Sequence, residues 1–399
     1  MGIERVSQNV YSIGVINPSL RIFDIVMKAN YGTSYNSYFI TGDKNVVIDT
    51  VHNDFFSEYI NNLQSITDLN EIDYIIINHT EPDHSGSLRK LLEMVPNAKI
   101  ICTTAGHKYL KQIMNMDFDA TCVKDSEILD IGNESLRFIV SPMLHWPDSM
   151  MTWFEKDRIL FSCDFLGAHF CEPALLDTEI HYQDEYLSEF KNYYNGIFGP
   201  FKKFVLSGLE KLKNLDINAI CPSHGPFLTK TIKSRMNDYH RWSLENDFEE
   251  KFILVLVASA YGFTRKLAEE AVCAINISKK VKARLLDVVA TPIDKVSEDI
   301  TKSCGLMVGS CTINRDAPKI IWDVLASVDA INSRGKPAGA FGSYGWSGEA
   351  VNMIAERMKG LGFRFNESVV KANFMPTEDD LIKMRNYAND IAESVIIKT

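Results

Sequence analysis

The feature that most constrains the fold of this chain is a cluster of metal-binding residue types directly after an apolar run. The β-branched run at residues 74–78 predicts a buried strand, and the sequence His79-Thr80-Glu81-Pro82-Asp83-His84 follows it immediately. Loops that a rigid sheet holds in place commonly carry functional sites. The fold must therefore fix imidazoles and carboxylates together on a loop at the end of a strand.

The length of 399 residues exceeds what one ordinary hydrophobic core contains, so we expect two domains. A charged stretch without a core pattern, Asp247 to Lys251, is typical of a domain boundary. We therefore place one domain at residues 1–250 and a second at 251–399.

Strand patterns recur throughout the first of these domains. Short apolar runs bounded by polar or glycine-containing segments predict strands. The runs lie at 46–50, 74–78, 99–102, 136–140, 158–162 and 217–221, with helical patterns between several of them, as at 87–94 and 201–212. The first domain thus mixes strands with helices.

The second domain has a more regular pattern. The continuous apolar run Phe252–Val257 is expected for a central strand of a parallel sheet. Further strands are predicted at 283–289, 305–309, 337–341 and 362–365, and helices intervene, one from about residue 265 and the last at 377–394. Strands that alternate with helices predict a doubly wound parallel α/β sheet with helices on both faces.

Three later predicted strands are also followed by a residue that can bind a metal. His145, Asp164 and His224 each lie just beyond a predicted strand. With the first cluster they make seven candidate ligands: His79, Glu81, Asp83, His84, His145, Asp164 and His224. One tetrahedral ion cannot use seven ligands, whereas two ions about 3.5–4 Å apart that share a carboxylate can. Asp164 is the natural bridge, because a carboxylate has two oxygens.

This arrangement resembles the metallo-β-lactamase fold family, which places metal ligands at these strand ends and usually begins with His-x-His-x-Asp-His. The chain has Glu81 where the zinc hydrolases of that family have the second histidine. A hard carboxylate in place of an imidazole moves the metal preference from zinc toward iron or manganese. The resemblance implies an αββα sandwich that holds two metal ions.

The remaining histidines and the cysteines have no comparable setting. We interpret His52, His107, His169, His181 and His240 as structural or surface residues, although His169 is close enough to Asp164 in sequence to support a ligand. Cys163 and Cys221 flank candidate ligands, and we expect them to pack into the core. The eight cysteines form no C-x-x-C pair, which argues against a thiolate zinc site or a rubredoxin-type iron site.

Three loops after strands of the second domain suggest a cofactor site. They lie at 259–264, 309–315 and 342–349, and the first precedes a helix. Hydroxyls and backbone N–H groups at a helix N-terminus bind phosphate without a lysine, and the chain lacks the G-x-x-x-x-G-K-S/T motif of nucleoside triphosphate sites. Ligands of open α/β sheets bind at the carboxyl ends of the strands.

All three loops, in this order, resemble those of flavodoxin, whose ligand is FMN. Cys311 departs from the family loops, which commonly have proline there, and Arg315 faces either the flavin or solvent. The residues that the resemblance implies for FMN binding are Ser259, Ala260, Tyr261, Gly262, Phe263, Thr264, Ser310, Cys311, Thr312, Ile313, Asn314, Ser343, Tyr344, Gly345, Trp346, Ser347 and Gly348.

The two halves together resemble the flavodiiron proteins over essentially the whole chain. The resemblance implies reduction of dioxygen to water, or of nitric oxide to nitrous oxide, with electrons that pass through FMN to two iron ions. It implies that one iron is held by His79, Glu81 and His145 and the other by Asp83, His84 and His224, with Asp164 between them.

The same resemblance bears on partners. Family members form a head-to-tail dimer, or a tetramer built from it, in which the FMN of one subunit lies beside the irons of the other. Tyr35 and Trp346 are candidates by analogy to line the gas pocket. No rubredoxin-like module follows the second domain, so we expect an external electron donor, either rubredoxin or a reduced deazaflavin coenzyme.

Charge and hydropathy restrict the remaining classes of function. The net charge of −10 disfavours nucleic-acid binding. No apolar stretch approaches eighteen residues and no signal peptide pattern opens the chain, so we expect a cytoplasmic protein that does not enter a membrane.

Two alternatives stay open: a zinc-dependent hydrolase with a flavodoxin-like appendage, and an electron-transfer module with a structural metal site. The sequence does not choose between dioxygen and nitric oxide.

Overall fold

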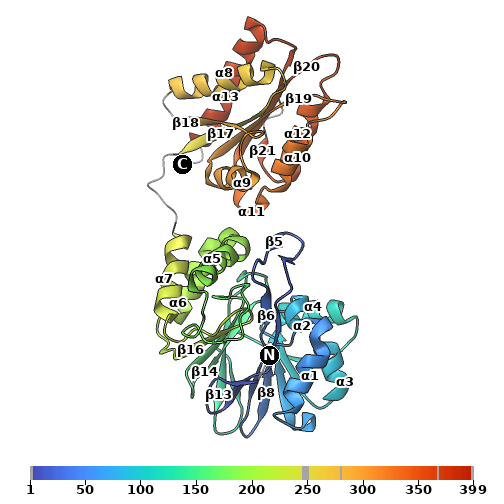
Figure 1. The fold of residues 1–399 in the computed structure, drawn as a ribbon, viewed down its shortest axis with the longest axis vertical. Coiled ribbons are helices and arrows are strands. Elements are labelled where there is room, and N and C mark those ends of the chain that lie inside the picture. Colours follow the sequence, from blue (N-terminus) through green and yellow to red (C-terminus); the bar gives the residue numbers. More distant parts are fainter. Residues whose placement is uncertain (1–2, 245–250, 279–280, 366–367, 397–399) are drawn as a thin grey trace. The chain divides into compact units, whose positions relative to one another are not determined.

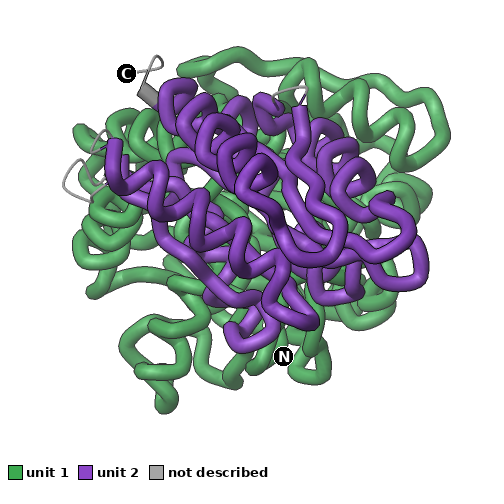
Figure 2. The backbone as a smooth tube through the Cα atoms, turned by 90° about the horizontal axis from the view of Figure 1, so that it is seen from above, with its two compact units in different colours: residues 1–245 green, residues 246–399 purple. Residues whose placement is uncertain are grey.

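The computed structural model describes residues 3–244, 251–278, 281–365 and 368–396 (Figure 1). The chain divides into two compact units, residues 1–245 and 246–399 (Figure 2). The domain boundary predicted near residue 250 lies at the end of residues 245–250, which are outside the described residues.

The first unit contains two large β-sheets. One sheet has seven strands in the order β1-β2-β7-β8-β9-β10-β11, antiparallel up to β8 and parallel from β8 to β11. Its strands are β1 (Glu4–Arg5), β2 (Val10–Ser12), β7 (Tyr38–Ile40), β8 (Asn45–Ile48), β9 (Ile72–Ile76), β10 (Lys99–Thr103) and β11 (Ala120–Val123). Parallel strands direct their carboxyl ends to one edge, which gathers the residues that follow them.

The other sheet of this unit has five strands in the order β12-β13-β14-β15-β16, and only β15 and β16 are parallel. They are β12 (Ile128–Asp130), β13 (Ser135–Val140), β14 (Met150–Phe154), β15 (Ile159–Cys163) and β16 (Ala219–Pro222). Two small ribbons pair β3 (Val15–Asn17) with β6 (Thr33–Tyr35) and β4 (Ile22–Phe23) with β5 (Met27–Lys28).

Helices cover the outer face of each sheet and complete an αββα sandwich, as predicted. The helices of the first unit are α1 (Phe56–Gln64), α2 (Pro82–Ser85), α3 (Leu88–Met94), α4 (Thr104–Met114), α5 (Gln183–Tyr193), α6 (Lys202–Leu212) and α7 (Ile232–Ser243), with short 3-10 turns at Asn53–Phe55, Leu69–Glu71 and Gly199–Phe201 and a π-helical turn at Tyr194–Phe198. One apolar cluster fills the space between the sheets, with side chains from both, such as Ile48 and Phe161. A second lies under α1, α3 and α4, and a third under α5, α6 and α7.

The second unit is a doubly wound parallel sheet in the order β18-β17-β19-β20-β21, with β22 also paired to β20. Its strands are β17 (Phe252–Ala258), β18 (Lys282–Asp287), β19 (Gly305–Cys311), β20 (Pro337–Tyr344), β21 (Arg364–Phe365) and β22 (Val370–Asn373). Its helices are α8 (Phe263–Ser278), α9 (Ile293–Lys302), α10 (Lys319–Ala326), α11 (Ala330–Ser333), α12 (Glu349–Gly360) and α13 (Glu378–Ile396). Helices α8 and α13 pack on one face, and α9, α10 and α12 on the other. This strand order is that of flavodoxin-like folds.

Several strands were not expected from sequence: β1 to β7, β11, β12, β14 and β22. Strand β14 contains neither valine nor isoleucine, the residues most typical of strands, so its sequence gives a weak signal. Strands β19 and β20 extend several residues beyond the predicted ends, into segments expected to be loops. Among the described residues, no helix is both long and apolar enough to cross a membrane.

Candidate functional site

The ends of four strands carry the candidate metal ligands of the first unit. His79 follows β9, His145 lies on the loop after β13, Asp164 follows β15 directly, and His224 follows β16. Pro82 occupies the first turn of α2, where the fixed backbone angle of proline favours a helix. Asp83 and His84 therefore lie on a short helical turn and not on the loop that the sequence pattern predicted.

All seven candidate ligands converge, and their ligand atoms fall into two groups. In the first group, His79, Glu81, His145 and Asp164 place one donor atom each within 4.8 Å of one another, and Asp83, His84 and His224 do the same in the second. All are buried except His145, which is partly exposed. The two groups are those that the resemblance implied for two ions.

The carboxylate of Asp164 lies between the two groups. Its Oδ2 is 3.3 Å from Nε2 of His145 and 3.7 Å from Nε2 of His79. Its Oδ1 is 3.2 Å from Nε2 of His84 and 3.5 Å from Nε2 of His224. One oxygen thus faces each group, which is the arrangement that a bridging carboxylate requires.

The second unit brings the three predicted loops together at the carboxyl ends of neighbouring strands β17, β19 and β20. The Thr264 and Ser343 hydroxyl oxygens lie 2.8 Å apart, and the Thr312 N–H donates to the Ser343 carbonyl at 3.2 Å. Gly262 adopts a positive φ of 82°, and a Cβ there would meet nothing within 4 Å. The first loop is therefore open at the N-terminus of α8, where backbone N–H groups are suited to bind an anion.

The predicted loop residues are not all in loops. Phe263 and Thr264 belong to α8, and Ser310, Cys311, Ser343 and Tyr344 belong to strands. Tyr261 and Trp346 expose 85% and 87% of their surface. Two aromatic rings with so little cover suit a flat ligand or a partner surface.

Comparisons with known proteins agree with the family resemblance of each unit. Residues 33–225 match the family model described as ODP family beta lactamase, and residues 255–386 match flavodoxin. Flavo-diiron protein FprA2 of Clostridium acetobutylicum is 46% identical over 98% of this chain and 99% of its own length. The chain belongs to the flavodiiron protein family.

Two further relatives of this flavodiiron protein extend the comparison. Anaerobic nitric oxide reductase flavorubredoxin of Citrobacter koseri is 34% identical, over 97% of this chain and 81% of its own length. The solved structure of rubredoxin oxygen:oxidoreductase from Desulfovibrio gigas matches this chain with a TM-score of 0.72 and 26% identity, over 99% of both chains.

The polar atoms of the first unit fit metal ions. Both carboxylate oxygens of Asp83, Nε2 of His84 and Oδ2 of Asp164 are buried without a hydrogen-bond partner. Buried polar atoms normally have partners, so several orphaned atoms at one point indicate a missing ligand. A set of imidazoles and carboxylates supplies the donors that iron and related divalent ions accept.

The charges of this flavodiiron site are strongly coupled. Burial opposes the charged form of His79, but hydrogen bonds to Asp148 and Glu81 outweigh it and raise its pKa to about 10. The pKa of His84 rises to about 10 and that of His145 to about 9, because nearby carboxylates outweigh their burial. Conversely, the histidines lower the pKa of Asp164 well below its ordinary value despite its burial. In the metal-free site these histidines are therefore protonated, and the protons take the place of the metal ions.

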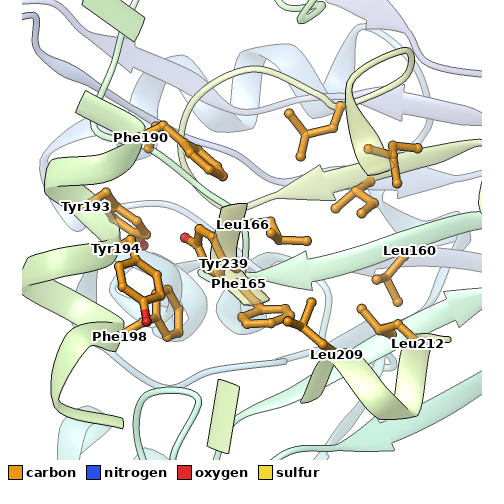
Figure 3. Close-up of a cluster of buried hydrophobic side chains, with 14 of the residues drawn as sticks. Leu160, Phe165, Leu166, Phe190, Tyr193, Tyr194, Phe198, Leu209, Leu212 and Tyr239 are labelled. Carbon is orange, nitrogen blue, oxygen red and sulfur yellow. The ribbon is translucent and has the colours of Figure 1, made fainter. Parts of the chain in front are cut away.

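Hydrogen bonds from outside the ligand set orient its side chains. His224 donates its Nδ1 proton to the Ser34 carbonyl at 2.6 Å, which directs Nε2 toward Asp83. The hydroxyl of Tyr193 donates to Oδ1 of Asp164 at 2.9 Å. Tyr193 ends α5, and Figure 3 shows it beside Tyr194 and Phe198 in the buried cluster of that side. The sequence patterns gave no sign of Tyr193.

Two carboxylates near the site were also not predicted. Asp148 accepts hydrogen bonds from His79 and from Thr80, and its place three residues after His145 was an available signal. Asp24, on the turn between β4 and β5, contacts Glu81. Partial desolvation, followed by its hydrogen bond with Glu81 and the negative charge of Glu81, raises the Asp24 pKa to about 7.

The other residues considered from sequence are placed as follows. The imidazole of His169 is buried, packs against His224 with 4.8 Å between ring centroids, and lies 2.9 Å from the Thr33 hydroxyl. Cys163 is also buried and lies near His84 and Asp164, and burial raises its pKa well above the ordinary value, which disfavours a thiolate ligand. Tyr35 packs on His224 with 5.9 Å between centroids. His52 stacks on Tyr35, while His107 is half-buried and His181 and His240 are exposed.

Proposed function

We propose that this flavodiiron protein is an oxidoreductase that reduces dioxygen to water, nitric oxide to nitrous oxide, or both. Electrons would come from an external donor, rubredoxin or a reduced deazaflavin coenzyme, and pass through FMN to two iron ions. The observation that carries the proposal is the pair of ligand groups on the two oxygens of Asp164, in a chain that also contains a flavodoxin domain. The relatives named for oxygen and for nitric oxide support both substrates.

The proposed ligand roles follow the two groups. His79, Glu81 and His145 would hold one iron, Asp83, His84 and His224 the other, and Asp164 would bridge them. The bound ions would supply the redox chemistry and the site at which a diatomic gas binds. Glu81 brings a hard carboxylate into the first group, which favours iron over zinc and disfavours the hydrolase alternative.

The protein's own groups would set the conditions of the reaction. Asp148 and the Ser34 carbonyl orient His79 and His224, so that one nitrogen of each ring points into the site. Burial of the site excludes bulk water and strengthens each electrostatic interaction there. Asp24 has a pKa near neutrality and contacts Glu81, so it is placed to deliver protons at the edge of the site.

In the second unit, the loops that follow β17, β19 and β20 would bind FMN. The first loop and the start of α8 would bind the phosphate, and Tyr261, Tyr344 and Trp346 are candidates to contact the ring. The buried Thr312 hydroxyl oxygen lacks a hydrogen-bond partner, as expected for a group that a ligand completes.

The proposed assembly is a head-to-tail homodimer, alone or within a tetramer. In it, the FMN of one subunit would lie next to the irons of the other, and Tyr35 and Trp346 would line the gas pocket. A heavily exposed Trp346 is consistent with a residue that a second subunit covers. Mass photometry combined with gas-consumption assays tests this arrangement, and a fully active monomer would contradict it.

The central experiment begins with metal and flavin analysis of protein prepared without oxygen. The reduced protein is then mixed with dioxygen or nitric oxide, while flavin absorbance and gas concentration are followed together. We expect about two irons and one FMN per chain, and flavin reoxidation coupled to loss of the gas. An Asp164→Ala variant that retains FMN is the matched control and should consume little gas.

The alternatives give different results in the same experiment. Two zinc ions and no iron would support the hydrolase. A flavin that cycles between redox states without gas consumption would support the electron-transfer module. Parallel assays with rubredoxin and with a reduced deazaflavin identify the donor, because only the competent one should reduce the flavin rapidly.

A further inference from the structure

A pair of cysteines and a histidine form a cluster at the edge of the seven-stranded sheet. Cys102 on β10 and Cys122 on the edge strand β11 are register partners in parallel strands. Cys102 is buried and Cys122 is exposed, and both are free thiols. His107 on α4 places Nδ1 3.8 Å from Sγ of Cys122.

Both cysteines point to the same face of the sheet. Cys102 packs in the apolar cluster under α1, α3 and α4, as does Ala120, two residues before Cys122. Val123 instead packs between the two sheets. Because side chains alternate along a strand, Cys122 lies on the helix-covered face with Cys102. A Cβ on Gly106 would lie 3.4 Å from the Cys102 Cβ, so α4 packs directly over this face.

The hydrogen bonds of His107 determine its tautomer. Its Nε2 lies 3.1 Å from the carbonyl oxygen of Phe118, which can only accept, so Nε2 carries the proton. In the neutral ring Nδ1 then has a free lone pair, and Nδ1 is the atom that faces the Cys122 thiol. Phe118 also packs edge-on against the imidazole and holds the ring in this orientation. The arrangement of thiol, base and orienting group is that of an activated nucleophile.

We propose that Cys122 is a peroxide-reactive modification site, with His107 as its base and Cys102 as the thiol that converts the oxidised Cys122 to a disulfide. In the first step the sulfur of Cys122 attacks hydrogen peroxide, an S–O bond forms and the O–O bond breaks. The thiol proton passes through Nδ1 of His107 to the leaving hydroxide, which departs as water. Sulfur is oxidised by two electrons to the sulfenic acid, and the peroxide is reduced.

In the second step the Cys102 thiol attacks the sulfenic sulfur of Cys122. An S–S bond forms, the S–O bond breaks, and the hydroxyl leaves as water with the thiol proton of Cys102. Neighbouring strands lie about 4.7–4.9 Å apart, within the range of about 4.4–6.8 Å between Cα atoms that disulfides span. Burial raises the pKa of Cys102 to about 12, so Cys102 does not react with peroxide itself and acts only on its oxidised neighbour.

The test compares two exposed cysteines in one molecule. Cys273 on α8 is also exposed and serves as the internal control, because both thiols meet the same peroxide. The full-length Cys102→Ala protein, with its metals and flavin, is treated with hydrogen peroxide in the presence of dimedone, because without Cys102 the Cys122 sulfenic acid is not captured as a disulfide, and the labelled peptides are measured by mass spectrometry. We expect Cys122 to be labelled about tenfold faster than Cys273. Equal rates would overturn the proposal.

A substitution isolates the contribution of the histidine. Gln at position 107 can still donate to the Phe118 carbonyl but lacks the ring lone pair that faces Cys122. His107→Gln should therefore reduce the rate ratio of Cys122 to Cys273 to about one. An unchanged ratio in a variant that retains normal flavin absorbance would remove His107 from the proposal.

Peptide mapping without reductant tests the second cysteine. We expect a linked peptide that contains Cys102 and Cys122 after peroxide treatment without dimedone, and its loss on reduction. Cys102→Ala should instead accumulate the dimedone adduct of Cys122. Progress of wild-type Cys122 to the sulfinic acid, without any linked peptide, would overturn the role of Cys102.

Discussion

Nδ1 of His79 lies 3.1 Å from Oδ2 of Asp148, and the N–H and hydroxyl of Thr80 both donate to the same oxygen at 2.8 Å. Through this one oxygen, the Asp148 carboxylate fixes both the ring of His79 and the backbone at Thr80. A ligand held in this way loses little conformational freedom when a metal binds, and its free nitrogen points into the site.

The Asp148→Asn substitution tests this relationship. The amide oxygen can still accept from Thr80, but it lacks the negative charge that strengthens the hydrogen bond from His79, so the tautomer and orientation of the imidazole are less well fixed. We expect metal affinity to fall by about 10–100-fold while the fold is retained. Competition with a chelator measures the affinity, and Asp117→Asn, at an exposed position, is the control. Unchanged affinity would contradict the positioning role.

Tyr193 and Tyr194 are neighbours whose hydroxyls contact different groups. Tyr193 donates to Asp164, whereas the hydroxyl of Tyr194 lies 2.7 Å from Oγ of Ser243, outside the ligand groups. Tyr193→Phe and Tyr194→Phe should each cost about 1–2 kcal/mol of unfolding free energy. Only Tyr193→Phe should change the electronic spectrum of the iron-loaded site. Equal spectral effects from both variants would show that the Tyr193 hydrogen bond has no specific role.

Metal uptake should release protons. The pKa values of His79 and His84 are about 10 and that of His145 is about 9 in the metal-free site, so all three rings are protonated at pH 7. A metal binds only the neutral imidazole, and its affinity should therefore increase as the pH rises from 7 toward these pKa values. Glu81 and Asp164 have lowered pKa values and release no proton.

Titration of anaerobic Fe²⁺ into weakly buffered apoprotein with a pH indicator measures this release. We expect about three protons per filled site near pH 7, and about one fewer in a His84→Ala variant. Metal binding without proton release would contradict the charge assignment of the three histidines.

Glu81→His tests the basis of metal choice. The substitution restores an imidazole at the position where the carboxylate of the first ligand group lies. We expect a larger zinc-to-iron ratio after loading from an equal mixture, together with loss of gas reduction. Glu81→Asp, which keeps a carboxylate, is the matched control and should keep the preference for iron. An unchanged ratio in Glu81→His would place the origin of selectivity elsewhere.

Much of the fold could be predicted from residue patterns because its central strands are short, apolar and clearly bounded. The ends of β10, β13 and β17 lie within one residue of the predicted ends. Strand β14 was missed because, unlike the equally buried β15 and β17, it contains no valine or isoleucine to mark it as a strand. The extension of β20 into Ser343 and Tyr344 was also missed, because backbone pairing with β22 decides where that strand ends.

The ligand types and their order along the chain are properties of the sequence, and they suffice to predict a two-metal site and a flavin domain. The placement of one Asp164 oxygen toward each ligand group depends on the packing of two sheets, as do the contacts of Asp148 with His79 and of Tyr193 with Asp164. These contacts join residues that are 19 to 80 positions apart, and no local pattern encodes such a pair. The sequence determines which donors are present, and the tertiary structure decides which of them meet, because only packing fixes distances between remote segments.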